Sequence, residues 1–130
     1  MSFPGADPMI STDWLAEHLG SPGLIVMDAT WFMPGTPRDA RAEHAEQHIP
    51  GAVFFDIDEI SDHANPLPHM LPDPAEFAVH ARRLGVEPDS QVVVYDSQGL
   101  FSAPRVWWMF RVMGHNQVAV LDGGLPKWMA

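Results

Sequence analysis

Short apolar runs alternate with helix-forming segments along the chain. The apolar runs predict strands at 24–29, 51–55, 91–95 and 117–121. Between them, segments bounded by capping residues, glycine or proline predict helices at 11–19, 38–47, 73–84 and 103–113. Strands that alternate with helices, with no hairpin signal between them, predict an α/β fold whose parallel sheet carries helices on both faces.

The two ends of the chain differ from this regular middle. Residues 1–9 contain two prolines and a glycine without periodicity, so we expect a flexible N-terminal arm before a single domain at 10–130. A length of 130 residues fits one domain. Residues 128–130 carry neither a stop signal nor a polar tail, so we expect the parent protein to continue beyond them.

The predicted helix at 103–113 is apolar nearly all round, which is typical of a helix buried on more than one side. One side packs on the sheet. We expect the other side to contact a partner outside this chain. In the isolated chain, Trp107, Trp108 and Phe110 would then form an exposed face with Trp128, and we expect self-association through it.

Composition narrows the classes of partner and the location. Acidic residues outnumber basic ones by 17 to 7, giving a net charge of −10, and no basic stripe offsets this charge. We therefore expect neither nucleic acid nor a membrane as a partner. No apolar run is long enough to span a bilayer and the N-terminus lacks the pattern of a signal peptide, so we expect a cytoplasmic location.

The chain has no cysteine, which excludes disulfides, thiolate metal sites and a cysteine nucleophile. His44 and His48 are four residues apart and could share a metal if both were helical. Ala45, however, stands where a zinc-protease motif requires glutamate. His63 and His69 are interpreted as solvated loop residues. We therefore predict no metal site and no cofactor.

The segment after the 91–95 strand joins a strand end to a helix start, a place where open parallel sheets bind ligands. Ser97 stands where an α/β hydrolase holds its nucleophile, but Tyr95 replaces the glycine that such a tight turn needs two residues earlier. A loop of this kind can aim backbone N–H groups at an anion. Asp96 is already anionic, so we interpret it as the cap of the following helix.

Arg105 occupies the first turn of the predicted helix at 103–113, where a cation is unfavourable to the helix dipole. Two roles remain open from the residues alone. The side chain pairs with a nearby acid such as Asp96, or it projects toward an anionic ligand.

Three motifs in order resemble the rhodanese family. His-Ile-Pro-Gly-Ala at 48–52, followed by Phe-Phe-Asp at 54–56, resembles its first signature, and Leu-Asp-Gly-Gly-Leu-Pro-Lys-Trp at 121–128 resembles its second. Between them, Tyr-Asp at 95–96 and the segment 99–111 are similar to the N-terminal domain of 3-mercaptopyruvate and thiosulfate sulfurtransferases.

That resemblance implies a rhodanese-like sheet of about five parallel strands, and a tandem enzyme whose two halves share the fold. A persulfide would form on a cysteine of the C-terminal half, which would be this chain's partner domain. Asp96 stands at the nucleophile's position here, so the resemblance implies no sulfur transfer by this chain alone. Phosphatases with this fold need the same cysteine.

The resemblance also implies roles for particular side chains. Arg105 would face the cleft between the halves and bind the carboxylate or sulfonate of a small anionic sulfur donor. Asp39 and His48 would form an orienting pair near that cleft, completed by a hydroxyl group from the other half. The alternative function is a stand-alone, catalytically silent rhodanese module that binds a protein partner.

Overall fold

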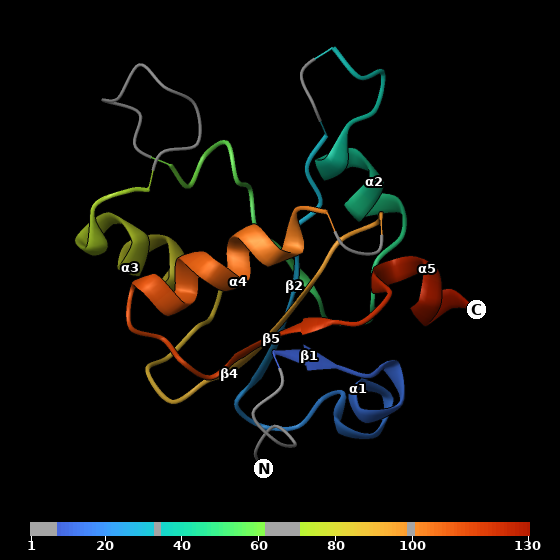
Figure 1. Cartoon of the computed structure of the whole chain (residues 1–130), viewed down its shortest axis with the longest axis horizontal. Helices are drawn as coiled ribbons and strands as arrows, with labels where there is room; N and C mark the ends of the chain where they lie inside the picture. The colour runs from blue at the N-terminus through green and yellow to red at the C-terminus, as the bar shows by residue number, and fades with distance from the viewer. Residues whose placement is uncertain (1–7, 33–34, 62–70, 99–100) are drawn as a thin grey trace.

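The computed structural model describes residues 8–32, 35–61, 71–98 and 101–130, and a parallel sheet forms its centre (Figure 1). The strands are β1 (Met9–Ile10), β2 (Leu24–Asp28), β3 (Val53–Phe54), β4 (Gln91–Tyr95) and β5 (Val118–Leu121). Their order across the sheet is β1-β5-β4-β2-β3, and every neighbouring pair is parallel. The predicted α/β fold with a parallel sheet of five strands is confirmed.

Helices cover both faces of the sheet. They are α1 (Thr12–His18), α2 (Ala40–Glu46), α3 (Pro74–Arg83), α4 (Ala103–Val112) and α5 (Gly124–Met129). In Figure 1, α3 and α4 lie on one side of the strands, and α1 and α5 lie on the other. Local signals set several boundaries, because Ser11 accepts a hydrogen bond from the amide of Trp14 and Asp73 accepts one from the amide of Ala75.

The central strand β4 shows why its sequence is continuously apolar. Val92 and Val94 pack into the core under α3 and α4, whereas Val93 and Tyr95 pack into the core under α1 and α5. Each of these four side chains is fully buried. A strand covered on both faces needs no polar alternation, so a continuous apolar run predicts it well.

Two elements were not predicted from the sequence. Met9 belongs to β1 although the sequence assigns it to the flexible arm, and residues 1–7 of that arm lie outside the described residues. The strand forms by pairing with β5, where the amide of Val120 donates to the carbonyl of Pro8 at 2.7 Å. A two-residue strand is too short to show a period. The other missed element is α5, which follows the Gly-Gly turn.

The expected single apolar face at α4 is wrong. Phe110 is only 1% exposed and lies in the core, and Trp107 packs against that core with its Nε1 donating to the carbonyl of Val118 at 3.2 Å. Trp128 packs on the opposite face of the sheet, so it cannot join them. On α4 itself, Trp108 and Val112 are the large apolar side chains left exposed.

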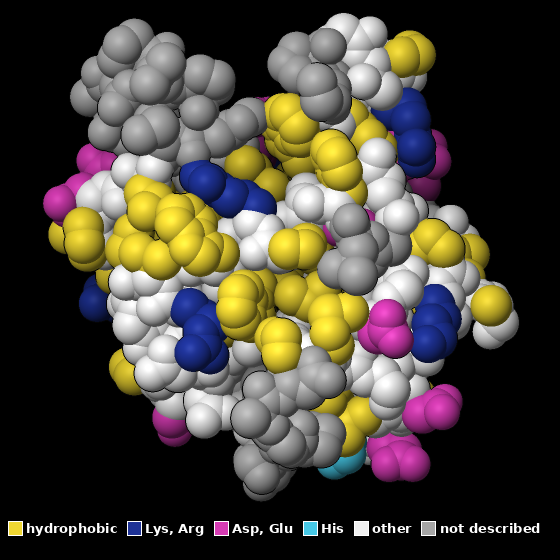
Figure 2. Space-filling view, in the orientation of Figure 1, with side chains coloured by type: hydrophobic (Ala, Val, Ile, Leu, Met, Phe, Trp, Pro, Cys, Tyr) yellow, Lys and Arg dark blue, Asp and Glu magenta, His cyan; other side chains and the backbone are white. Residues whose placement is uncertain are grey.

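Basic side chains lie between the apolar patches on the face that carries α4 (Figure 2). Self-association of the chain therefore stays a prediction, now limited to a smaller apolar area.

No helix in the described part of the chain has the length and apolar character needed to cross a membrane.

Candidate functional site

The carboxyl ends of β2 and β4 lie side by side at the middle of the sheet, because Asp28 and Tyr95 are partners in register. Asp28 ends β2, and Asp96 directly follows β4. Parallel sheets bind their ligands outside this edge. The residues that follow the two strands are therefore the candidates for chemistry.

The carboxylate of Asp96 is fully buried and fills a ring of backbone amides. Its Oδ2 accepts hydrogen bonds from the amides of Phe101, Ser102 and Ala103 at 2.8–3.0 Å. Its Oδ1 accepts a further one from the amide of Gln98 at 3.0 Å. The N-terminus of α4 is thereby capped, since the Ser102 side chain makes no cap bond of its own. The interpretation of Asp96 as a cap is confirmed.

Side chains also tie this loop to the end of β2. Ser102 Oγ donates to the carbonyl of Ala29 at 2.6 Å, and the amide of Ser97 donates to Thr30 Oγ1 at 3.0 Å. The side chain of Ser97, the second residue of this loop, is half-buried. These two contacts tie the described residues of the loop to the end of β2.

Asp28 and His44 form a second buried polar contact at this edge. Asp28 Oδ1 accepts from the amide of Thr30 at 3.0 Å and from Thr30 Oγ1 at 2.5 Å. His44 Nδ1 donates to Asp28 Oδ2 at 2.9 Å. The two side chains border a cavity of about 100 Å³ that Ser97 also lines. Sequence reasoning missed this pair because α2 must fold back over β2 to form it.

The rings of His44 and His48 stack on each other instead of converging on one point. Their rings lie 4.3 Å apart, and His48 Nδ1 donates to the carbonyl of His44 at 2.6 Å. Within the described ranges, no group of three acidic or histidine side chains has an arrangement that could hold a metal. His63 and His69 lie outside the described residues.

The structure does not bring Asp39 and His48 together. Asp39 caps the N-terminus of α2, where its Oδ1 accepts from the amide of Ala42 at 3.1 Å. His48 follows the C-terminus of the same helix. The seven residues of α2 separate the two positions, and at a rise of about 1.5 Å per residue this helix is about 10 Å long. In the described part of the chain Asp39 and His48 have separate hydrogen-bond partners, and their role as an orienting pair stays a prediction.

Arg105 lines a cavity of about 260 Å³ at the start of α4, together with Trp31, Ile57, Phe101 and Ser102. The rings of Trp31 and Phe101 are stacked, with centroids 6.4 Å apart and an interplanar angle of 14°. The sequence offers one signal for Trp31, which is an aromatic residue just past a strand's carboxyl end.

The charge of Arg105 is partly removed from water. Its guanidinium lies 5.1 Å from the ring centre of Trp108, and burial lowers the pKa of the group. The proposed pairing with Asp96 is wrong, because backbone amides occupy that carboxylate. A partly desolvated cation beside stacked aromatic rings can bind a small anion with an apolar part.

A larger cavity of about 380 Å³ lies next to this one and also contains arginines. The arginines of this larger cavity form ion pairs with acidic side chains. Arg41 contacts Asp56 at 2.9 Å, and Arg38 contacts Glu43 at 2.6 Å. The cavity that Arg105 lines stays a candidate for an anion because its cation lies beside two stacked aromatic rings.

The sequence profile of the rhodanese-like domain matches residues 11–130. The chain belongs to the rhodanese family. Among solved structures, the crystal structure of SseA from Escherichia coli, one of the 3-mercaptopyruvate sulfotransferases, superposes with a TM-score of 0.89 at 50% identity. That superposition covers 95% of this rhodanese-family chain and 47% of the SseA chain.

Curated relatives give the same match at the level of sequence. Human 3-mercaptopyruvate sulfurtransferase is 53% identical over 127 residues, which cover 93% of this chain and 43% of the human protein. The mitochondrial thiosulfate/3-mercaptopyruvate sulfurtransferase 1 of Arabidopsis thaliana is 52% identical over 129 residues, 99% of this chain and 34% of that protein. The chain thus spans less than half the length of these relatives.

Proposed function

We propose that this chain is the N-terminal half of a sulfurtransferase that moves sulfur from 3-mercaptopyruvate or thiosulfate to a thiophilic acceptor. A second rhodanese domain of the same protein would supply the cysteine that carries the sulfur. Support comes from sulfurtransferases that are 52–53% identical and more than twice as long. The observation that carries the proposal is the Asp96 carboxylate inside the loop that would otherwise hold the nucleophile.

The Asp96 loop explains why this half would not react. Backbone amides converging on a thiolate lower its pKa and stabilise its charge. Here four amides converge on a carboxylate, which cannot carry sulfur.

In the proposed protein, the thiolate of the other half attacks the donor sulfur, and the carbon–sulfur bond of mercaptopyruvate breaks. The electron pair leaves as the enolate of pyruvate, which takes up the proton of the donor thiol.

The contribution of this half is to bind the donor. Mercaptopyruvate and thiosulfate are both small anions. The Arg105 cavity offers them a cation beside apolar and aromatic walls at the carboxyl edge of the sheet. An arginine fork can hold a carboxylate with two parallel hydrogen bonds. In this proposal, Arg105 holds the anionic end while the sulfur points to the other domain.

The second candidate is a catalytically silent module that binds a protein partner. Trp108 and Val112 favour it, because they are 42% and 50% exposed on the outer side of α4. A second rhodanese domain with a cysteine in its loop, encoded directly downstream, would exclude this candidate.

The test is a cyanide-to-thiocyanate assay with each donor. The purified chain alone should give no turnover above the control without protein, and the two-domain protein should be active. Turnover by the chain alone would overturn the proposal.

The donor-binding role has a matched control on the same helix. Arg105 and Arg111 each lie over a tryptophan ring, at 5.1 and 5.3 Å. In the two-domain protein, Arg105→Lys should raise the KM for mercaptopyruvate about 10- to 100-fold, since a charged hydrogen bond is lost. Arg111→Lys should leave the KM unchanged. An unchanged KM with a lower melting temperature would make Arg105 a structural residue.

A further inference from the structure

A separate cavity lies between α3 and α4, far from the edge that carries Asp96 and Arg105. Its volume is about 300 Å³, and we call it the α3–α4 cavity. The segments 86–88 and 113–115, which precede β4 and β5, complete its lining. Because these segments lead into the strands, the cavity lies toward the amino ends of the sheet. The residues that line it are Pro74, Phe77, Ala78, Ala81, Arg82, Val86, Glu87, Pro88, Phe110, Met113, Gly114 and His115.

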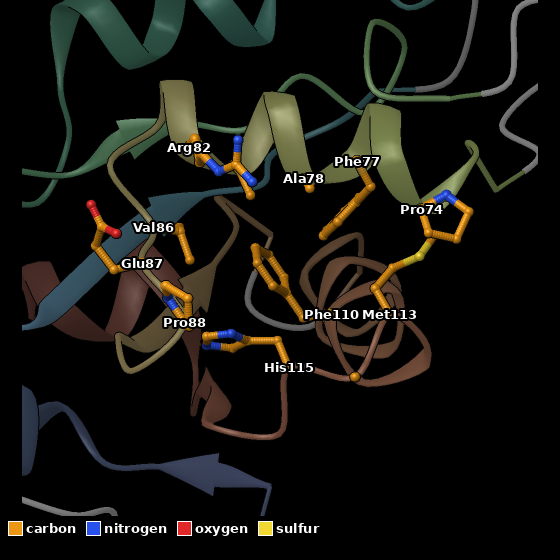
Figure 3. A pocket seen from close by; sticks show the side chains of 12 residues that line it. Pro74, Phe77, Ala78, Arg82, Val86, Glu87, Pro88, Phe110, Met113 and His115 are labelled. Carbon is orange, nitrogen blue, oxygen red and sulfur yellow. The ribbon is translucent and has the colours of Figure 1, made fainter.

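The floor of the α3–α4 cavity is aromatic. Phe77 and Phe110 are 4% and 1% exposed, and their rings meet edge to face at 5.1 Å. His115 meets the ring of Phe110 edge to face at 5.6 Å. Figure 3 shows these rings and the ring of Pro88 bordering the same space. Such a floor suits another planar ring, which gains both apolar burial and edge-to-face contact.

Hydrogen bonds hold the walls in place without a ligand. His115 Nε2 donates to the carbonyl of Ser90 at 2.8 Å, which fixes the orientation of the ring. The amide of Val86 donates to the carbonyl of Ala81 at 3.0 Å and anchors the segment that follows α3. A pocket that is already ordered loses little conformational entropy when a ligand binds.

Two charged side chains, Arg82 and Glu87, line the α3–α4 cavity, and they point in different directions. In Figure 3 the guanidinium of Arg82 lies along the cavity side of α3, whereas the carboxylate of Glu87 points away. Within the described part of the chain, Arg82 forms no ion pair. The cavity therefore presents a positive charge at its rim, although the chain as a whole carries −10.

The helix dipole explains why a basic residue stands at position 82, in the last turn of α3. It does not explain why the side chain of Arg82 points toward the cavity. The last turn of α3 carries His80, Arg82 and Arg83, as the negative end of a helix favours. That explanation applies equally to both arginines. Only Arg82 lines the cavity, so Arg83 serves as its matched control.

We propose that the α3–α4 cavity binds a small aromatic monocarboxylate. The ring lies on Phe77 and Phe110, and the carboxylate pairs with Arg82. This site differs from the Arg105 cavity in its position and in the residues that form its floor. The proposal that it binds a carboxylate does not depend on sulfur transfer. The chain would thus hold a second small-molecule site on the side of the sheet where α3 and α4 pack.

The experiment is an NMR titration of the chain with indole-3-acetate, beside its neutral isostere indole-3-acetamide. Saturable shifts should appear at Phe110 and His115, and the amide should bind at least about 10-fold more weakly because it carries no charge. Arg82→Gln should weaken binding by about 10-fold or more, and Arg83→Gln should change it less than about 2-fold.

A third variant tests the cavity apart from its charge. Ala78→Leu adds side-chain volume to the α3 wall and should abolish binding while leaving the melting temperature within a few degrees. Equal weakening by Arg82→Gln and Arg83→Gln would overturn the proposal, as would an absence of saturation. Shifts centred on Trp31 and Arg105 would also overturn it, because they would place the acid in the other cavity.

Discussion

Asp96 and Asp28 are buried carboxylates at the same edge of the sheet, on neighbouring strands, yet they are satisfied in opposite ways. Asp96 takes its hydrogen bonds from backbone amides of its own loop. Asp28 takes an amide, a hydroxyl and the imidazole of His44. A carboxylate bonded by backbone fixes the shape of a loop. One bonded by side chains links separate elements and can exchange its partners.

The largest effect should come from Asp96→Ala. The change leaves four amides at the start of α4 without their acceptor, so we expect the free energy of unfolding to fall by about 3–5 kcal/mol. Urea unfolding followed by tryptophan fluorescence would measure it. Asp122→Ala is the control, because among the described residues the ion-pair contact of that exposed carboxylate is with Lys127, at 3.5 Å. Equal losses for the two variants would refute the structural role of Asp96.

A smaller loss is expected at the other carboxylate. Asp28→Asn keeps the bond from the amide of Thr30 but weakens the one from His44, and we expect a loss of about 1–3 kcal/mol. Combined with His44→Gln in a double-mutant cycle, the coupling should be about 0.5–3 kcal/mol. Additive effects would mean that the 2.9 Å contact contributes no stability.

Tyr95 precedes Asp96 in the chain and is the register partner of Asp28, and the charge of Asp28 acts on its phenol group. Its Oη accepts from the amide of Ile49 at 3.2 Å, so Tyr95→Phe should cost about 1–2 kcal/mol by leaving that buried amide unpaired. Chemical denaturation would check the loss. A neutral result would show that Ile49 finds another acceptor.

The same side chain gives a pH signature. Burial, and then the charge of Asp28, raise the pKa of Tyr95 above its ordinary value of about 10. The folded chain then keeps a proton that the unfolded chain loses, so stability should fall as pH rises above about 10. Tyr95 is the single tyrosine of the sequence, which makes ultraviolet titration unambiguous. Asp28→Asn should lower this pKa toward its ordinary value.

The smallest effect should follow Asp39→Ala, an exposed cap remote from both carboxylates. Loss of the bond to the amide of Ala42 should cost about 1 kcal/mol, as at other helix N-termini. Thermal unfolding would measure it, and Asp39→Asn should restore most of the loss. A cost as large as that of Asp96→Ala would erase the distinction drawn here between exposed and buried caps.

The fate of the two carboxylates also shows what a sequence can predict. The Asp96 cap was predictable, because all its donors lie within seven residues of it. The contact between Asp28 and His44 spans sixteen residues and depends on how α2 folds over β2. No local sequence pattern specifies how α2 folds over β2. The cavity that Arg105 lines was not predicted from the residues for the same reason, because its walls come from distant parts of the chain.

Elements follow the same rule. The boundaries of β4 and α4 agree with the sequence to within a residue, because apolar runs and glycine stops are local signals. Strand β1 has two residues, and only its partner makes it a strand. Motifs compensated for this gap, since the resemblance implied five strands where the apolar runs alone predicted four.

The place of β5 in the sheet bears on how the chain reaches its native state during synthesis. β5 is the last strand to be made, yet it inserts between β1, the first, and β4. Until it does, β1 has no neighbour, and one side of β4 presents unpaired amides and carbonyls to other nascent chains. Pairing Met9 with Val120 closes a loop that contains most of the residues of the chain, and this closure carries an entropic cost. A ribosome that stalls before residue 118 would therefore expose an adhesive strand edge, and chaperone binding should peak there.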